Sequence, residues 1–411
     1  MEATESVSWG ITATALVLLM TPGVAFFYGG MVRVKSVISM MMMSFGAIGL
    51  IAVLWMLYGY SMSTVGDPAQ FAGDPFADFA LAGAASSPHA NTALLTVAYG
   101  ATFAIITVAL ISGAIADRAR FGPWLIFVGV FGTIGYFPIA AWVWGGGWIT
   151  HLGTTLFGKD SGIAVIDYAG GTAVHINAGA AALALALVLG KRIGFRKGIQ
   201  RPHNVPLTLL GAALLWFGWF GFNVGAQWTT PGMGQAGLIT INTLGASAAG
   251  ILGWILVETL RDGKATSVGA VSGLVAGLVA ITPACADLAP GWGLLLGGLA
   301  GVACAASVEL KYRMGLDDSL DVVGLHLVGG LLGTVYLGFF ATGHGLFTGG
   351  DGRQLVVQVL ASGGVLVYAF AVAWITGVVI EKTIGFRVTK QAEVAGVDRF
   401  VHGEQGYALA D

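Results

Sequence analysis

Two histidines stand inside stretches that are otherwise apolar enough to cross a membrane. His175 lies in DYAGGTAVHINAGAAALALALVLG, residues 167–190, and His326 lies in DVVGLHLVGGLLGTVYLGFF, residues 321–340. Ionisable side chains inside a membrane are costly and usually face a pathway for a solute or an ion. A charged imidazole is costly in apolar surroundings, so we expect both rings to be neutral. Neutral imidazoles donate and accept hydrogen bonds, to each other and to a small polar solute.

The two histidines are expected at similar depths, which would let them meet. With spans drawn over 163–190 and 321–342, His175 lies about 18 Å and His326 about 24 Å from the outer end of its span. Neighbouring GG and AG pairs allow the helices to approach closely. A local polar contact within the bundle is the alternative interpretation. A haem or metal pair would need further ligands, and none stands at a plausible spacing, so we predict no cofactor and no metal.

The composition is that of a membrane protein with many spans. Of the 411 residues, 56% are hydrophobic and only 10% are charged, and the mean hydropathy is +0.82. Soluble domains carry about 25% charged residues. Glycine accounts for 65 residues, roughly twice its usual share, and small residues let membrane helices pack closely. Cys285 and Cys304 fall in separate apolar spans and are expected to be packing residues.

The apolar stretches predict an all-α integral membrane protein of eleven helices, since a span needs about 20 mostly apolar residues. Five, five and one spans make two inverted halves, about 11–190 and 205–342, followed by an eleventh helix at about 354–381. Transporters built from inverted halves hold their site between the halves, and the histidines fall on the last span of each half. The membrane domain covers 1–382, and 383–411 form a polar tail. The predicted spans are 11–32, 37–60, 91–116, 122–143, 163–190, 205–226, 235–258, 266–286, 291–310, 321–342 and 354–381.

The basic residues between the spans predict the orientation. With the amino terminus outside, all of the 19 Lys and Arg residues except Lys159 and Arg353 fall on the inner side, in agreement with the positive-inside rule. We therefore expect the amino terminus outside and the tail in the cytoplasm. The residues expected inside are Arg33, Lys35, Arg118, Arg120, Lys191, Arg192, Arg196, Lys197, Arg201, Arg261, Lys264, Lys311, Arg313, Lys382, Arg387, Lys390 and Arg399.

A tryptophan and an acid lie where a polar solute would enter. The segment AAWVWGGGW places Trp144 at the outer boundary before the fifth span, and Asp167 lies about 12 Å outward of His175. A Trp face beside a glycine run can bind a small cation by cation–π attraction. Trp at a membrane boundary is also an ordinary anchor, and this alternative stays open.

Four more aromatic residues stand at helical spacing in the third and sixth spans. Tyr99 and Phe103 in AYGATFAIIT are one turn apart on one face. The segment WFGWFGFNVGAQ supplies Trp219 and Phe222. Aromatic residues at this spacing pack inside a bundle more often than they line a pore, so spacing alone does not assign them to a site.

Taken together, these segments resemble those of bacterial and archaeal ammonium transporters of the Amt/Mep/Rh family, along essentially the whole chain. The segments that carry the resemblance are TPGVAFFYGGMVR, VWGGG, DYAGGTAVHINAG, GWFGFN, TPACA, GLHLVGG and HGEQGY. The most specific feature is the combination of DYAGG and VHIN with a second histidine in GLHLVGG.

The resemblance implies pore roles for five residues. His175 and His326 match the family's twin pore histidines. Phe103 and Phe222 match two stacked phenylalanines that close the outer end of the pore. Trp219 matches a tryptophan that lines the pore.

The resemblance also implies an outer recruitment site. Trp144 matches its central tryptophan, Tyr99 matches an adjacent aromatic residue, and Asp167 matches a buried acid that orients and charges this vestibule. The chain departs from the family at Ala226, where many members have a serine whose hydroxyl bonds the ammonium ion. Tyr99 is a candidate to supply the missing oxygen.

The function that the resemblance implies is ammonium transport: capture of NH₄⁺, deprotonation, and conduction past the histidines, with electrogenic uptake expected. It further implies a homotrimer in the plasma membrane, with ammonium or ammonia as substrate and a cytoplasmic face on which a PII-type nitrogen-signalling protein can dock. We expect no enzyme activity and no nucleic-acid partner.

Several alternatives to transport stay open. They are a sensor with little flux, a passive channel for neutral ammonia, a channel for water or urea, and a haem-containing redox enzyme. The short tail argues against a dedicated sensor. The entrance residues Trp144 and Asp167 favour a cation as the captured species.

Overall fold

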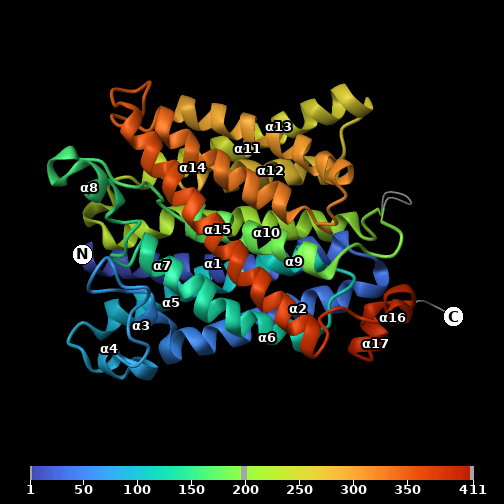
Figure 1. Ribbon diagram of the computed structural model, residues 1–411. Helices are drawn as coiled ribbons and strands as arrows, with labels where there is room; N and C mark the ends of the chain where they lie inside the picture. Colours follow the sequence, from blue (N-terminus) through green and yellow to red (C-terminus); the bar gives the residue numbers. More distant parts are fainter. Residues whose placement is uncertain (1, 196–200, 408–411) are drawn as a thin grey trace.

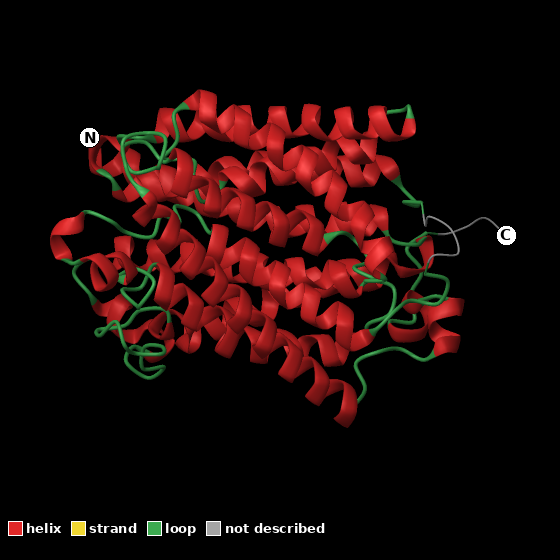
Figure 2. Ribbon diagram, turned by 45° about the horizontal axis from the view of Figure 1, so that its top comes forward, coloured by secondary structure: helices red, strands yellow, loops and turns green. Residues whose placement is uncertain are grey.

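The computed structural model describes residues 2–195 and 201–407 (Figure 1). Helices and connecting loops make up these ranges, and the extended pairing within them is limited to one isolated bridge (Figure 2). The predicted all-α architecture is confirmed. Arg196 and Lys197, which were predicted to be inside, and residues 408–411 of the tail lie outside the described ranges.

Ten helices of the described residues are long and apolar enough to cross a membrane, and each coincides with a predicted span. The remaining predicted span, 266–286, corresponds to α12 (Ser267–Ile281), an apolar helix of 15 residues that rises about 22 Å. Ten of the predicted spans therefore meet the length requirement, and α12 falls short of it. The other helices are α1 (Glu2–Met31), α2 (Val37–Leu54), α3 (Tyr60–Met62), α4 (Ala82–Ser86), α5 (Ala90–Ile111), α6 (Phe121–Phe131), α7 (Phe137–Val143), α8 (Leu152–Phe157), α9 (Asn177–Leu189), α10 (Val205–Val224), α11 (Ala236–Asp262), α13 (Pro290–Met314), α14 (Val328–Phe340), α15 (Gly352–Thr383), α16 (Lys390–Ala395) and α17 (Val397–Val401).

Both histidines lie in π-helical turns. His175 is in the turn Gly171–Ile176, which continues into α9, and His326 is in the turn Val323–Leu327, which continues into α14. π-Helical turns are rare and are frequently found at functional sites, because they rotate side chains out of the regular helical register.

The fifth span begins later than predicted. Residues 162–170 are not helical, and the helix begins at Gly171, directly after Gly170, whose φ of 114° suits glycine. The predicted start of the helix is therefore wrong, and the helical rise used for the depth of His175 does not apply over 163–170, since this residue lies about one turn from the start of its helix. The cause is Asp167, whose carboxylate binds the first backbone N–H groups of the helix and fixes where it begins.

The arrangement of the helices places α15 against both histidine-bearing elements. α1 and α10 lie side by side through the middle of the bundle (Figure 1). α11, α12 and α13 pack together on one side of this pair, and α2, α5 and α6 lie on the other. α15 crosses the bundle diagonally and contacts α9 and α14.

Ion pairs tie the loops together at the end of the bundle where α16 and α17 lie (Figure 1). Arg192 pairs with Asp117 at 3.1 Å and with Asp317 at 2.8 Å. The Asp317 side chain is fully buried and the Arg192 side chain is largely so. This end holds basic residues predicted to be inside, whereas α8 and the start of α15 lie at the opposite end.

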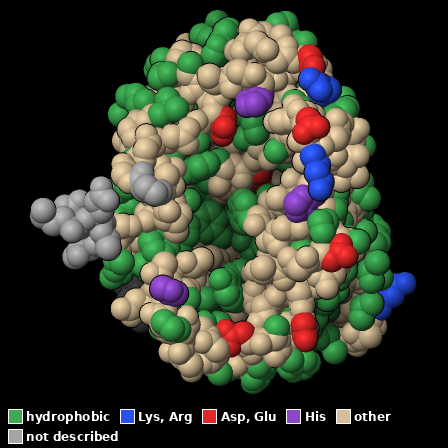
Figure 3. Space-filling view, turned by 90° about the vertical axis from the view of Figure 1, so that its left-hand side faces the viewer, with side chains coloured by type: hydrophobic (Ala, Val, Ile, Leu, Met, Phe, Trp, Pro, Cys, Tyr) green, Lys and Arg blue, Asp and Glu red, His purple; other side chains and the backbone are tan. Residues whose placement is uncertain are grey.

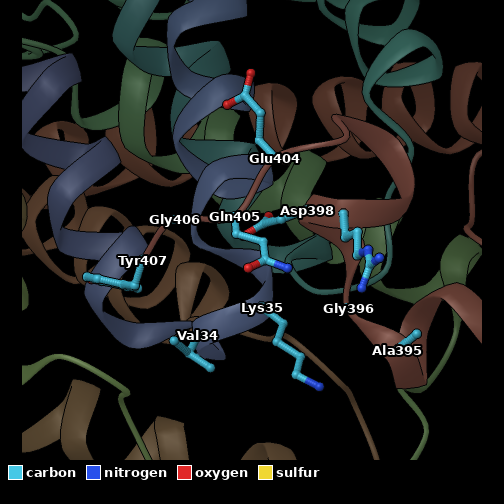
Figure 4. Close-up of a pocket in the computed structure, with 10 residues that line it drawn as sticks. Val34, Lys35, Ala395, Gly396, Asp398, Glu404, Gln405, Gly406 and Tyr407 are labelled. Carbon is cyan, nitrogen blue, oxygen red and sulfur yellow. The ribbon is translucent and has the colours of Figure 1, made fainter. Parts of the chain in front are cut away.

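The tail packs against the turn between α1 and α2. The Asp398 carboxylate accepts hydrogen bonds from the backbone N–H groups of Ile38 at 3.0 Å and Ser39 at 2.7 Å. The tail and this turn enclose a pocket of about 130 Å³, in which Lys35 lies near the segment that ends at Tyr407 (Figure 4). The described part of the tail is thus ordered against the membrane domain.

The ion pair of Asp317 predicts a pH-dependent stability. Burial raises the pKa of the Asp317 carboxyl, but Arg192 lowers it more, and the net pKa lies below its ordinary value of 3.8. A carboxyl with a depressed folded pKa stabilises the fold above its unfolded pKa, and this stabilisation is lost as the pH falls through the folded pKa. We expect Asp317→Asn to cost about 3 kcal/mol at pH 7, measured by thermal unfolding of the purified protein in detergent. The difference from wild type should shrink below about pH 4; equal unfolding temperatures at pH 7 would contradict this role.

Candidate functional site

A cavity of about 370 Å³ opens at the end of the bundle that holds the amino terminus. We call it the entrance cavity. Its wall includes Tyr99, Phe103, Trp144 and Phe222, and Trp144 is 40% exposed. Figure 3 shows this end of the molecule hollowed near its centre, with mostly hydrophobic and uncharged atoms around the hollow. A small cation in this cavity would meet aromatic faces, which attract cations.

Two phenylalanines form the floor of the entrance cavity. Phe103 of α5 and Phe222 of α10 stack with their ring centroids 4.2 Å apart and their planes 20° apart. Tyr99 and Trp144 both meet Phe103 edge-on, at centroid distances of 5.0 Å and 5.9 Å. The stacked rings separate the entrance cavity from the space below.

A second, narrower cavity lies beyond the phenylalanines, and we call it the central cavity. Its volume of about 10 Å³ suits a molecule about the size of one water. Its lining is mostly aliphatic and aromatic, and the ionisable exceptions are His175, His326 and Tyr28, whose hydroxyl donates to the carbonyl of Leu110 at 3.2 Å. Trp219 stacks on His175 with a centroid distance of 5.6 Å, and its indole N–H donates to Thr282 Oγ1 at 2.8 Å.

The two imidazoles face each other across the interface of their helices. His175 Nδ1 and His326 Nδ1 are 3.2 Å apart, and the ring planes are 27° apart. When both rings are neutral, one proton lies between these atoms, so one ring is protonated on Nδ1 and the other on Nε2. The buried Nε2 of His175 has no hydrogen-bond partner among the described residues, which leaves it available to a solute. The described residues hold no group of three or more His, Cys, Asp or Glu side chains suited to a metal ion.

Two glycines allow the histidine-bearing helices to approach this closely. A Cβ on Gly179 would lie 2.5 Å from the backbone nitrogen of Leu327, which directly follows His326. A Cβ on Gly330 would lie 3.1 Å from Cβ of His175. His175 and the residue that follows His326 are therefore each packed against a glycine of the opposite element, and a larger residue there would push the two elements apart.

Asp167 acts as the cap of the His175 helix. Its Oδ1 accepts hydrogen bonds from the N–H groups of Gly170 at 2.8 Å and Gly171 at 2.6 Å. Its Oδ2 accepts from the N–H groups of Thr172 at 2.8 Å and Ala173 at 3.2 Å, and from the Thr172 hydroxyl. The carboxylate thus satisfies backbone donors that an uncapped helix would leave unpaired.

The structure places seven of the eight predicted site residues on the walls of the two cavities. Asp167 is the exception, because it lies behind the wall and lines neither cavity. Its carbonyl nevertheless accepts a hydrogen bond from Trp144 Nε1 at 2.9 Å. The Tyr99 hydroxyl points its proton at the carbonyls of Gly221 and Phe222, at 3.1 Å and 3.0 Å, and its oxygen keeps the capacity to accept a hydrogen bond. Its use in place of the missing serine hydroxyl stays a prediction.

Three further residues near the site were not predicted, although the sequence carries a signal for each. Tyr168 lines the entrance cavity and accepts a hydrogen bond from Gln227 at 2.7 Å. Asp318 stands eight residues before His326, the same spacing as Asp167 before His175, and accepts from the N–H of Val323 at 2.7 Å. Gln358 is a buried polar residue in the last, otherwise apolar span.

Removal of the Asp167 cap should loosen the start of the His175 helix. Asp167→Ala leaves four backbone N–H groups without their acceptor, and each buried unsatisfied donor costs about 1–3 kcal/mol. We expect amide hydrogen exchange across Gly171–Ile176 to be at least about tenfold faster, which corresponds to about 1.4 kcal/mol. Mass spectrometry of peptides from this segment measures the effect, with α13 peptides as the internal control. Unchanged exchange would contradict the capping role.

The sequence pattern that describes the Ammonium Transporter Family matches residues 8–407. An ammonium transporter of Mycobacterium tuberculosis (strain CDC 1551 / Oshkosh) is 48% identical over 441 aligned positions, which cover 98% of this chain and 90% of that protein. The ammonium transporter Amt1 of Archaeoglobus fulgidus is 38% identical, over 98% of this chain and 99% of that protein.

Solved structures of Amt and Mep proteins have a similar fold. The structure of Candida albicans Mep2 superposes with a TM-score of 0.85 and 30% identity, over 98% of this chain and 93% of that chain. A structure named Sensor Amt Protein superposes with a TM-score of 0.87 and 25% identity, over 97% of this chain and 98% of that chain.

Proposed function

This chain belongs to the ammonium transporter family, and from this membership we propose that it captures ammonium in the entrance cavity, removes a proton near the Phe103–Phe222 stack and conducts ammonia along His175 and His326. It is a multi-pass protein of the plasma membrane. The observation that carries the proposed mechanism is the pair of facing imidazoles in an apolar cavity closed by two phenyl rings.

Selectivity follows from the size and polarity of the central cavity. Ammonium and potassium are similar in size and charge, so a wide, water-filled pore would discriminate poorly between them. A bare cation is costly in a narrow apolar space, whereas neutral ammonia is not. Ammonium can shed a proton at the entrance to such a space, and potassium has no proton to lose.

Capture relies on the aromatic wall and on a charge behind it. The face of Trp144 attracts the cation directly. Asp167 lines neither cavity; its carboxylate contributes negative potential, and its backbone carbonyl accepts the hydrogen bond that fixes Trp144. Because Ala226 has no hydroxyl, capture depends on the aromatic faces, on the buried charge and on the oxygen of Tyr99, which can accept a hydrogen bond while its proton points at two backbone carbonyls.

Conduction relies on the two imidazoles. The unpaired Nε2 of His175 offers ammonia a hydrogen-bonding partner inside an otherwise apolar cavity. The contact between the two Nδ1 atoms joins the rings into one hydrogen-bonded unit that can also carry the proton released from ammonium. Ammonia and the proton then cross together, and uptake is electrogenic.

The architecture proposed for this transporter has eleven spans in two inverted halves, with the amino terminus outside and the tail in the cytoplasm. The short α12 is the eighth span. The repeated arrangement of Asp167 with His175 and Asp318 with His326 supports the inverted repeat, since each acid caps a π-helical turn that holds a histidine. The family resemblance further supports a homotrimer and a PII-type partner on the cytoplasmic face.

A second candidate function is that of a sensor with little flux, because one of the similar solved structures is named Sensor Amt Protein. A third is a passive channel for neutral ammonia. The three functions differ in what crosses the membrane. Electrogenic transport moves charge, passive conduction alkalinises the interior without charge movement, and a sensor does neither.

Variants of the central cavity test the proposal. We expect His175→Ala to reduce the ammonium-evoked current of proteoliposomes at least about tenfold. The substitution leaves His326 without its hydrogen-bonded partner and removes one hydrogen-bonding group from the central cavity. Asp167→Ala should reduce the current similarly. The matched control is His151→Ala, since His151 is exposed and lines neither cavity. Wild-type current in the His175→Ala protein would contradict the role of the histidine pair.

A further inference from the structure

A buried glutamine of α15 holds the segment that leads into Asp167. Gln358 is fully buried, and its Oε1 accepts a hydrogen bond from the N–H of Ile166 at 2.8 Å. Its Nε2 donates to the carbonyl of Ile166, also at 2.8 Å. The side-chain amide therefore pairs with both backbone groups of one residue, as a neighbouring strand would.

The same amide reaches the helix of the second histidine. Gln358 Nε2 also donates to the carbonyl of Thr334 at 3.1 Å. Thr334 lies on α14, about two turns after His326. Gln354, one turn earlier on α15, donates from Nε2 to Gln358 Oε1 at 3.2 Å and to the carbonyl of Ala164 at 2.9 Å.

All of the hydrogen-bonding capacity of the Gln358 side chain is used. A glutamine amide has two donors and room for two acceptor contacts, and Ile166, Gln354 and Thr334 occupy all four. These contacts fix which end of the amide is oxygen and which is nitrogen. In the reverse orientation the NH₂ group would meet the N–H donors of Ile166 and Gln354. Residues 162–170 are not helical and belong to no strand, so their buried backbone groups need partners elsewhere in the chain, and the Gln358 side chain is the partner of Ile166.

The position of Ile166 connects this amide to the proposed transport site. Ile166 directly precedes Asp167, whose carboxylate caps the His175 helix and whose carbonyl holds Trp144. One amide is thus linked, through Ile166 and Asp167, to the entrance tryptophan and to the helix of the first histidine. Through Thr334 it is linked to the helix of the second histidine.

We propose that Gln358 is a positioning residue for ammonium transport, which sets Asp167, Trp144 and the two histidine-bearing helices relative to one another. The effect on transport rests on the proposed function. The positioning of the segment around Ile166 rests on the hydrogen bonds alone. Gln358 touches neither cavity and acts only through the residues that it holds.

The test compares Gln358→Leu with Ser362→Ala in the full-length protein. Leucine keeps most of the side-chain volume but removes every hydrogen bond. Ser362 is also buried on α15, one turn away, and its hydroxyl bonds only the carbonyl of Gln358 within the same helix. The control therefore perturbs the same stretch of helix without touching Ile166.

Hydrogen exchange gives the first measurement, because it is independent of transport. In Gln358→Leu we expect exchange of peptides covering 164–176 to be at least tenfold faster than in wild type, with exchange in α13 unchanged. Ser362→Ala should match wild type in both regions. Equal exchange of 164–176 in Gln358→Leu and wild type would overturn the proposal.

Ammonium-evoked current in proteoliposomes, normalised to folded protein, gives the second measurement. We expect the ammonium concentration for half-maximal current to rise at least fivefold in Gln358→Leu and less than twofold in Ser362→Ala. A merely structural role would lower the yield of folded protein without changing this concentration. Faster exchange with an unchanged half-maximal concentration and maximal current would overturn the positioning role.

A conservative variant keeps the test decisive if Gln358→Leu does not fold. Gln358→Glu, protonated in this buried site, retains the acceptor for the N–H of Ile166 but has a single donor. We expect its exchange rate over 164–176 and its half-maximal ammonium concentration to lie between the wild-type values and those expected for Gln358→Leu. Values equal to wild type in both measurements would overturn the proposal. If wild type itself gives no ammonium current, the proposed function fails, and the exchange comparison still decides whether Gln358 holds the segment.

Discussion

The capping of one helix by one carboxylate is the interaction on which the rest of the site depends. Asp167 binds the N–H groups at the start of the His175 helix and so decides that the helix does not extend back before Gly171. This start point sets the height of His175 in the bundle. The carbonyl of the same residue holds Trp144, so the entrance cavity and the central cavity share one reference point. A buried charge of this kind is tolerated because several donors surround it.

The second histidine is positioned by a related device. Asp318 accepts the N–H of Val323 at the start of the π-helical turn that holds His326. Close packing through Gly179 and Gly330 then brings the two elements together until the Nδ1 atoms are 3.2 Å apart. Capping fixes the height of each ring, and glycine contacts fix the distance between them. The α15 helix packs across both histidine-bearing helices, α9 and α14 (Figure 1).

Much of this could be predicted from the sequence, because the strongest signals are local. Apolar run length gave the spans, and two histidines in such runs pointed to the site. The predicted start of the fifth span was wrong because hydropathy carries no information about helix caps. Residues 163–170 are apolar enough to be helical, but the hydrogen bonds of the Asp167 side chain begin the helix at Gly171. The engagement of the Tyr99 hydroxyl and the clamp of Gln358 on Ile166 are contacts between distant parts of the chain, which no local pattern contains.

The central claim is that an apolar pore with paired histidines passes ammonium and rejects potassium. Charge movement in proteoliposomes of the wild-type protein after an ammonium jump, with an equal potassium jump as control, tests it most directly. The account predicts a sustained current for ammonium and none for potassium. Equal currents for the two cations would contradict it, since potassium has no proton to lose at the phenylalanine stack.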